Sequence, residues 1–301
     1  MSAPRTLVSG GTGFVGRFIV EHLLRAGHDV TVMGRTAPED GLFSAPVTFV
    51  AGALDPDRDH GPAFAGVDNF VHAAFDHVPG RYRGGEGNDA VGFRRRNLAG
   101  TIALFEAARE KGVRRTVFLS SRAVYRPSAA GIVLTEAAAT APDTLYGEVK
   151  LAAEHHLGRM IEEGWAGGSL RITGVYGPAG PGRVHKWSRL FADYLAGKPV
   201  EPRAGTEVHG GDVAEAVRLM LVADDGAVPR SGGPFNVSDI VVDRHDLLAI
   251  VKDANDCAHP LPARADASRL NRMSAEKLRS LGWRPGGAVF FHETVRALAG
   301  P

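Results

Sequence analysis

A glycine-rich turn near the N-terminus is the feature that most narrows the folds open to this chain. Three of its glycines, Gly10, Gly13 and Gly16, recur at three-residue intervals. They lie in the segment SGGTGFVG, after the apolar run Arg5–Ser9 and before a helical pattern over 14–26. Glycine permits the positive φ of a tight turn, and its missing side chain lets backbone amides approach a pyrophosphate at a helix N-terminus. This placement predicts a dinucleotide-binding loop that includes Phe14 and Val15, with a purely structural turn as the alternative.

The rest of the first half alternates short apolar runs with helical patterns, which is typical of βαβ units around a parallel sheet. Strands are predicted at 29–33, 47–51, 68–73, 116–120, 169–172 and 235–237, and helices at 92–111, 144–163, 185–196 and 213–223, with three more helices near the C-terminus. We therefore predict an α/β fold, a doubly wound parallel Rossmann sheet with a smaller C-terminal substrate domain. The predicted domains are a Rossmann domain over 1–172, completed by about 210–238, and a substrate domain over 173–209 and 239–301.

Composition and charge exclude several classes of function. The formal net charge of the 301 residues is +1, so no overall field attracts the chain to nucleic acid or to an anionic membrane. No stretch of about 18 apolar residues occurs and the N-terminus lacks the apolar core of a signal peptide, so we expect a cytoplasmic protein without a membrane partner. The single cysteine, Cys257, excludes an internal disulfide framework. His155 and His156 have no partner at metal-ligand spacing, so we expect no metal.

The end of the second predicted strand bears on the choice of cofactor. NAD sites commonly place an acidic residue there for the ribose 2′-hydroxyl, whereas an arginine can pair with a 2′-phosphate. Here the strand ends in Met33-Gly34-Arg35-Thr36, and the next carboxylate is Glu39, beyond a proline. Arg35 therefore favours NADP, with NAD as the alternative. In a less specific interpretation, Arg35 lies flat on the adenine or points to solvent.

Two side chains with proton chemistry stand one helical turn apart. Tyr146 and Lys150, in TLYGEVK, share one face of a helix, where the ammonium group would favour the phenolate and lower a phenol pKa of about 10. Asp143 is the predicted N-cap, which puts Tyr146 in the first turn, near the positive end of the helix dipole. Ser120 and Ser121 end an apolar run at the carboxyl edge of the predicted sheet, where a hydroxyl can hold a carbonyl oxygen.

A series of motifs along nearly the whole chain gives a resemblance to a known family. The motifs are GGTGFVG, VHAA at 71–74, RNLAGT around Asn97, SSRAVY at 120–125, YGEVK, LRITGVYGP at 170–178, VHGGDVAEA at 208–216 and LGW at 281–283. With these motifs in this order, the chain resembles the extended short-chain dehydrogenase/reductase superfamily, in its NAD(P)-dependent epimerase/dehydratase branch. Members usually dimerise through the helices that here begin near Gly92 and Thr144, so the resemblance implies a homodimer.

The resemblance also implies roles for individual residues. Ser121, Tyr146 and Lys150 would be catalytic together with Asn97, and Lys150 would also hold the nicotinamide ribose. The predicted cofactor-binding residues are then Gly10, Gly13, Phe14, Val15, Gly16, Arg35, Ala53, Leu54, Ala73, Ala74, Tyr146 and Lys150. Ala53 stands where the family usually has an acidic residue, so adenine contact at this position would be through the backbone.

Three departures from the family pattern narrow the chemistry. Arg122-Ala123 replaces the acidic pair of the dehydratases, Gly174 replaces an asparagine that often binds a sugar diphosphate, and Arg35 indicates NADP. We therefore predict an NAD(P)-dependent oxidoreductase that transfers hydride between nicotinamide and a carbonyl or alcohol of a small sugar, polyol or hydroxy acid. The alternatives are a nucleotide-sugar epimerase with bound NAD and, in another class, a non-catalytic dinucleotide-sensing regulator.

Candidates for substrate contact are Phe75, Ser121, Arg122, Gly174, His185 and His209. Less specific interpretations compete with some of them. His209 is equally well explained as a turn histidine, and the segment at His185 as an amphipathic lid helix with Trp187 packed inward. Asp212 and Glu215 form a capping-box pattern. The run Arg94–Arg96 could face an anionic ligand, but it is more simply a solvated helix face.

Overall fold

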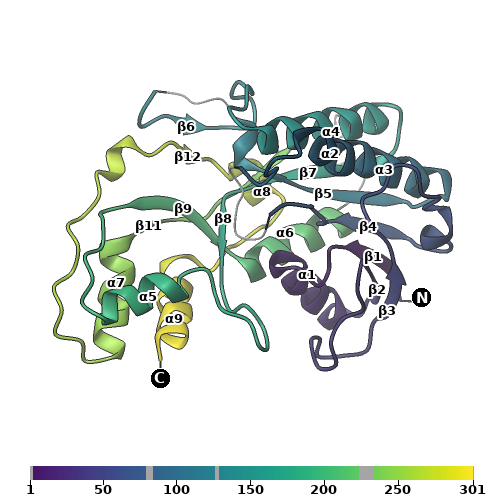
Figure 1. Cartoon of the computed structure of the whole chain (residues 1–301). Coiled ribbons are helices and arrows are strands. Elements are labelled where there is room, and N and C mark those ends of the chain that lie inside the picture. The colour runs from purple at the N-terminus through teal and green to yellow at the C-terminus, as the bar shows by residue number, and fades with distance from the viewer. Residues whose placement is uncertain (1–2, 79–83, 126–128, 224–232, 301) are drawn as a thin grey trace.

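The computed structural model describes residues 3–78, 84–125, 129–223 and 233–300. Its central feature is a parallel sheet with helices on both faces. A smaller mixed sheet, with helices of its own, lies beside it (Figure 1). The central sheet consists of β1 (Arg5–Ser9), β2 (Asp29–Gly34), β3 (Thr48–Ala51), β4 (Asn69–His72), β5 (Arg115–Ser121), β7 (Ala166–Ile172) and β10 (Phe235–Val237). This confirms the predicted α/β fold with a doubly wound sheet.

The strand order explains where a ligand can bind. The sheet runs β10-β7-β5-β4-β1-β2-β3, with parallel pairing throughout. The chain therefore builds outward from β1 in one direction and from β4 in the other, and the order reverses between these two neighbours. In open α/β sheets, ligands bind outside the carboxyl ends of the strands at such a reversal.

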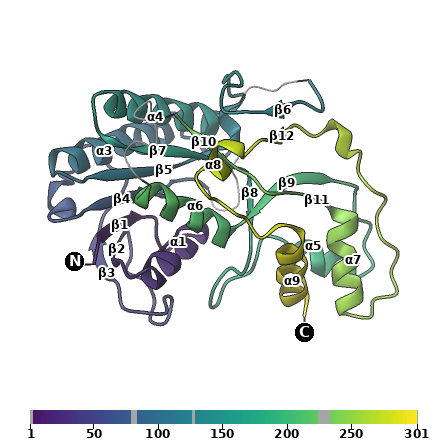
Figure 2. The same cartoon turned by 180° about the vertical axis from the view of Figure 1, so that it is seen from behind.

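Helices cover both faces of this sheet, as the two views in Figures 1 and 2 show. The helices are α1 (Phe14–Arg25), α2 (Ala90–Arg94), α3 (Gly100–Glu110), α4 (Leu145–Glu162), α5 (Ser188–Leu195), α6 (Gly210–Val222), α7 (Arg244–Ala254), α8 (Glu276–Ser280) and α9 (Gly287–Ala299), with short turns η1 (Gly61–Phe64), η2 (Arg95–Ala99), η3 (Arg122–Val124) and η4 (Ala267–Arg269). Successive strand residues point to opposite faces. Thus Val8 packs with α1 and α6, whereas its neighbour Leu7 packs with α3 and α4.

The later part of the chain forms a second layer beside the carboxyl edge. Here β8 (Gly174–Tyr176), β9 (Ala204–His209) and β11 (Ile240–Asp243) form a sheet in the order β11-β9-β8. Tyr176 and Val242 pack from this sheet into a core shared with α5, α7 and α9. A short parallel pair joins β6 (Val133–Leu134) to β12 (Arg272–Met273). The division into a Rossmann and a substrate domain at the predicted boundaries stays a prediction.

Two predicted N-caps are wrong. The N-cap of α4 is Thr144, not Asp143: Thr144 has extended φ and ψ, and its Oγ1 accepts a hydrogen bond of 3.1 Å from the amide of Gly147. The N-cap of α6 is His209, not Asp212, so α6 begins earlier than the capping-box pattern suggested. The helix predicted at 92–111 is also interrupted, because the π-helical turn η2 separates α2 from α3.

Candidate active site

The predicted phosphate loop connects β1 to α1, and two of its glycines are sterically required. Gly10 has a φ of +73°, and a Cβ on it would lie 2.7 Å from the backbone of Ala74. A Cβ on Gly16 would lie 2.1 Å from the carbonyl oxygen of Gly10. The loop therefore depends on these glycines both for its turn and for its close contact with the end of β4, where Ala73 and Ala74 lie.

The start of α1 fits an anionic ligand. Gly13 is the N-cap and has no side chain to cap the helix, and the first turn contains no acidic residue. The side chains of Phe14 and Val15 pack against the core, so it is the backbone amides that remain for a ligand. Unpaired amides at a helix N-terminus attract phosphate groups. The residues present thus fit the pyrophosphate of a dinucleotide.

Sequence reasoning missed a second contact at this loop. Arg183, between β8 and α5, donates a 2.7 Å hydrogen bond from Nη1 to the carbonyl oxygen of Thr12. In the same region, Arg17 Nη2 donates to the carbonyl oxygen of Pro178 at 2.6 Å. The segment after β8 therefore lies against the phosphate loop and brings positive charge to it. No local pattern indicates a contact between positions this far apart, although an arginine in a Gly- and Pro-rich loop is a weak signal.

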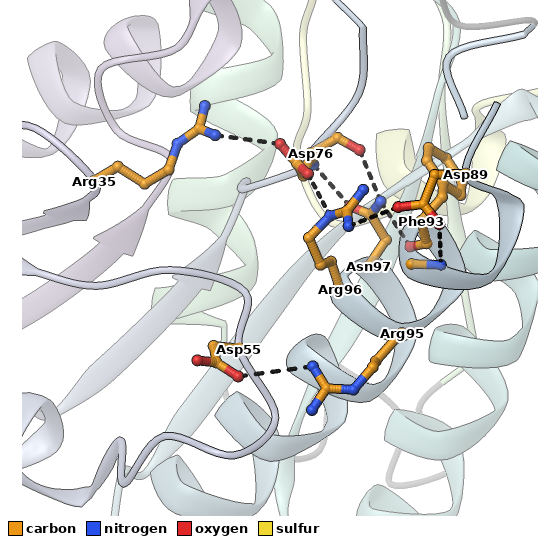
Figure 3. Close-up of polar contacts among 9 residues, drawn as sticks. Arg35, Asp55, Asp76, Asp89, Phe93, Arg95, Arg96 and Asn97 are labelled. Atoms are coloured by element: carbon orange, nitrogen blue, oxygen red, sulfur yellow. Dashed lines mark hydrogen bonds and ion pairs between the residues drawn. The ribbon is translucent and has the colours of Figure 1, made fainter. Parts of the chain in front are cut away.

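The structure brings several other predicted cofactor residues to the ends of β2 and β3. The Arg35 side chain is 78% exposed, and its Nη1 lies 3.3 Å from Oδ1 of Asp76 (Figure 3). The amide of Gly52 donates to the carbonyl oxygen of Gly34, which fixes the segment containing Ala53 beside the end of β2. Leu54, by contrast, is buried in the core with α3.

The catalytic candidates meet where the start of α4 packs on the end of β5. A Cβ on Gly147 would lie 2.3 Å from the carbonyl oxygen of Ala123, so only glycine allows α4 to lie this close to η3. Ser121 immediately precedes η3, and its Oγ accepts a 3.1 Å hydrogen bond from the amide of Ala123. Tyr146 precedes Gly147 in the first turn of α4. This packing places Ser121 and Tyr146 at the same corner of the carboxyl edge.

Lys150 lies one turn further along α4 and is almost completely buried. Its Nζ donates a 2.7 Å hydrogen bond to the carbonyl oxygen of Leu119 and lies 6.0 Å from the centroid of the Tyr146 ring. Burial lowers the pKa of Lys150 to about 7, and the negative charge of Glu154 opposes that shift. Glu154 is itself fixed by a buried ion pair to Arg171, with a nitrogen–oxygen distance of 2.8 Å.

Phe75 forms a wall beside this pair. Its ring centroid lies 4.9 Å from that of Tyr146, and Lys150 Nζ lies 4.6 Å from it. Asn97, predicted as catalytic, is buried in the π-helical turn η2. Its amide group exchanges two 2.7 Å hydrogen bonds with the backbone of Asp76, the residue after Phe75. These contacts suit a positioning role for Asn97, which holds the segment that carries Phe75.

The two histidine candidates lie among aromatic rings. His209 is buried, with ring centroids of Phe18, Tyr176 and Phe290 between 4.5 and 5.4 Å away, and its Nδ1 accepts from the amide of Gly211. Burial lowers the pKa of His209 to about 4, so the ring is neutral at pH 7. His185 lies 5.0 Å from the ring of Phe191. These surroundings suit packing and helix capping at least as well as substrate contact.

Two further predicted residues have well-defined neighbours. Arg122 Nη2 donates a 2.8 Å hydrogen bond to the carbonyl oxygen of Asn271, which ties η3 to the segment before β12. Asp212 accepts a hydrogen bond from the amide of Gly286 at the start of α9, and burial raises its pKa to about 6. Asp212 thus anchors another helix instead of capping its own.

Gly174 lies beside the carboxylate of Glu207, whose side chain is only 14% exposed. Gly174 lies two residues after Ile172, which pairs with Ser121 in the central sheet. In the smaller sheet, Gly174 itself pairs with Glu207 of β9. A Cβ on Gly174 would lie 2.6 Å from Oε2 of Glu207. Lys186 Nζ donates a 2.6 Å hydrogen bond to the same oxygen. Burial raises the pKa of Glu207, while the Lys186 ammonium opposes the shift.

The described residues contain no cluster of three or more potential metal ligands and no helix long and apolar enough to cross a bilayer. One surface hollow lies between the C-terminal ends of α3 and α4. It is lined mostly by charged side chains, including Glu106, Arg109 and Arg159. Because these helices run opposite to the strands, their C-terminal ends lie at the amino edge of the sheet, away from the catalytic candidates.

A glycine loop after β1, together with a doubly wound parallel sheet, defines a dinucleotide-binding protein of the Rossmann type. More particularly, the chain belongs to the NAD dependent epimerase/dehydratase family, whose model matches residues 6–238. This confirms the resemblance to extended short-chain dehydrogenases/reductases that the motifs indicated.

Comparison with individual proteins gives relatives with different activities. A 3-beta-hydroxysteroid dehydrogenase of Mycolicibacterium neoaurum is 32% identical over 76% of this chain, but the match spans only 63% of that relative. A UDP-glucose 4-epimerase of Corynebacterium glutamicum is 26% identical over 93% of this chain and 91% of its own length. The solved UDP-glucose 4-epimerase of Thermus thermophilus, in complex with NAD, is 29% identical, with a TM-score of 0.77 over 98% of this chain and 97% of that one.

Proposed function

We propose that this chain is an NAD(P)-dependent oxidoreductase that transfers hydride between nicotinamide and a carbonyl or alcohol of a small sugar, polyol or hydroxy acid. The observation that carries the proposal is the convergence of Ser121, Tyr146 and Lys150 at the carboxyl edge, next to a glycine loop that fits a pyrophosphate. A non-catalytic sensor has no need of a phenol placed in this way. The cytoplasmic location and the homodimer remain predictions.

In this mechanism the cofactor supplies or accepts the hydride, and the protein handles the proton. The Ser121 hydroxyl orients the substrate oxygen by a hydrogen bond. The Tyr146 phenol donates a proton to that oxygen during reduction and removes it during oxidation. Lys150, when protonated, stabilises the phenolate by its positive charge and holds the nicotinamide ribose. Phe75 excludes water from one side of the pair, since its ring packs on both Tyr146 and Lys150.

The second candidate is a nucleotide-sugar epimerase, which the names of two relatives favour. The surroundings of Gly174 favour the oxidoreductase instead. The Glu207 carboxylate fills the space that a side chain at position 174 would occupy. A side chain at position 174 that binds a sugar diphosphate therefore cannot be accommodated without moving Glu207, which is held by its ion pair with Lys186.

A substrate panel separates these candidates. We expect small sugars, polyols or hydroxy acids to produce a net change in the absorbance of reduced nicotinamide when purified protein is supplied with NADP(H) or NAD(H). Interconversion of UDP-glucose and UDP-galactose, with no net use of added cofactor, would instead assign the epimerase. Binding of both cofactors without turnover of any compound in the panel would favour the sensor.

For the cofactor we propose NADP(H), because Arg35 directly follows β2, at the position where NAD sites commonly place an acidic residue for the ribose hydroxyl. Replacing Arg35 with Ala is expected to weaken NADPH binding roughly 10- to 100-fold, the equivalent of a charge-assisted hydrogen bond of about 1.5–3 kcal/mol. NADH binding should change little. Both affinities can be measured from the fluorescence of the reduced cofactor. A wild-type protein that prefers NADH would contradict the assignment.

A further inference from the structure

One carboxylate lies between two arginines at the proposed 2′-phosphate site. Arg35 Nη1 is 3.3 Å from Oδ1 of Asp76, and Arg96 Nε is 2.7 Å from its Oδ2. Figure 3 shows the two guanidinium groups approaching Asp76 from opposite sides, one from the end of β2 and the other from η2. An acidic side chain thus binds the same arginine that would have to bind the cofactor phosphate.

The backbone of Asp76 is held firmly in this place. The Oδ1 atom of Asn97 accepts from the amide of Asp76, and Nδ2 of Asn97 donates to its carbonyl oxygen, each at 2.7 Å. Nδ2 also donates to the carbonyl oxygen of Phe93 at 3.0 Å, and Asn97 is only 1% exposed. Asp76 can therefore leave Arg35 only by rotating its side chain, not by moving its backbone.

The two arginines differ in how firmly they are bound. Arg96 also pairs with Asp89 at 3.1 Å, and Asp89 in turn caps α2 by accepting from the amide of Gly92. Arg96 therefore has two carboxylate partners, one of which is built into a helix start. Arg35 is 78% exposed and pairs with Asp76 at the longer distance. An exposed, single, long ion pair is the one that exchanges at least cost.

We propose that Asp76 is an internal competitor for Arg35, so that the 2′-phosphate of NADP(H) binds only by displacing this carboxylate. The proposal rests on the assignment of Arg35 to that phosphate. The displaced Asp76 carboxylate then keeps its ion pair with Arg96. The carboxylate at position 76 thus lowers the preference for NADP(H) that Arg35 provides. Its presence or absence would decide whether the enzyme also accepts NAD or is strict for NADP.

The test compares two nucleotides that differ only in the phosphate at issue, adenosine 2′,5′-bisphosphate and adenosine 5′-monophosphate. Isothermal titration calorimetry measures their affinities for the wild type and for Asp76→Asn, which keeps the backbone contacts to Asn97. We expect Asp76→Asn to bind the bisphosphate roughly 3- to 10-fold more tightly, with little change for the monophosphate. Thermal unfolding of each variant checks that the fold is intact.

Two further variants make the result specific. Asp89→Asn removes a carboxylate that also pairs with Arg96 but not with Arg35, so it should leave both affinities nearly unchanged. In an Arg35→Ala background, the gain from Asp76→Asn should largely disappear, because the competitor then has nothing to compete for. This double-mutant cycle separates competition for Arg35 from a general loss of negative charge.

Each other outcome overturns the proposal. If Asp76→Asn weakens bisphosphate binding, Asp76 orients Arg35 instead of competing for it. If the affinity is unchanged, the pair is only a surface ion pair. Should Arg35→Ala alone leave bisphosphate binding unaffected, the cofactor assignment fails together with this inference. An effect of Arg35→Ala without an effect of Asp76→Asn removes the inference and leaves the NADP(H) assignment standing.

Discussion

Replacing Tyr146 with Phe is expected to lower turnover roughly 10²- to 10⁴-fold, the contribution typical of a positioned proton donor or acceptor. The phenylalanine ring keeps the packing against Phe75, whose centroid lies 4.9 Å away, and the glycine loop lies on other elements. Cofactor affinity should therefore change little. The loss would appear in kcat and in kcat/KM alike, because the missing proton transfer occurs in the transition state.

A matched control comes from a second tyrosine, Tyr125, which is buried. Tyr125 donates a 2.6 Å hydrogen bond to Oδ1 of Asn236 and lies outside the proposed proton path. Tyr125→Phe removes a hydroxyl in the same way, but it should cost about 1–2 kcal/mol of stability and leave turnover within a few fold of the wild type. The kinetics are measured on the substrate that the panel identifies, with a deuteride isotope effect to show that chemistry limits the rate. Near wild-type turnover of Tyr146→Phe under that condition would exclude the tyrosine as the proton donor or acceptor.

The phosphate loop and the helix N-caps show which parts of the fold could be predicted from the sequence. The strands and the glycine loop are local patterns, and the strand order follows from repeated βα units, so these parts of the fold could be predicted. Caps are also local, but Asp143 and Thr144 are adjacent and both are good capping residues. Which of the two begins α4 depends on where the helix packs against Ala123, and no local pattern contains that information.

The surroundings of the candidate site were less predictable, because they depend on contacts between distant segments. His209 was ambiguous in sequence, since the rings of Phe18 and Phe290 that enclose it come from opposite ends of the chain. The contact of Arg183 with Thr12 has the same origin. Asp76 lies in no motif, and its contact with Arg35 forms only because β2 and β4 end on either side of β1.

Replacing Lys150 with Met is expected to damage catalysis and cofactor binding without reducing stability at neutral pH. Methionine has a similar volume and can fill the space between the rings of Phe75 and Phe118, each less than 5 Å from Nζ. The substitution removes the charge near Tyr146, so the apparent pKa of the tyrosine in the activity profile should rise and turnover at pH 7 should fall at least about 100-fold. Cofactor binding should weaken as well, since the ribose contact is lost.

Whereas Lys150→Met should lower turnover and cofactor affinity, it should raise the free energy of unfolding at neutral pH. A lysine with a structural role would show the reverse. The pKa of Lys150 is about 7 in the folded chain and about 10.5 when unfolded, so the unfolded chain binds more protons between these pH values. Wild-type stability therefore rises with pH across that window, and below about pH 7 the full cost of burying the ammonium group is present. Lys150→Met removes this cost, on the order of a few kcal/mol, against about 1 kcal/mol for the lost hydrogen bond to Leu119.

Denaturant unfolding from pH 6 to 10, beside turnover and cofactor titration, tests both parts. Lys277→Met is the matched control. Lys277 is partly buried on α8, and like Lys150 it lies close to an aromatic ring, 4.1 Å from the centroid of Phe235, and donates to a backbone carbonyl oxygen, that of Pro234. It should leave turnover and cofactor affinity unchanged. If Lys150→Met were instead destabilised at pH 7 and as active as the wild type, Lys150 would be a structural residue. A burial cost of this size at Lys150 is best explained by the charge that the lysine brings to Tyr146.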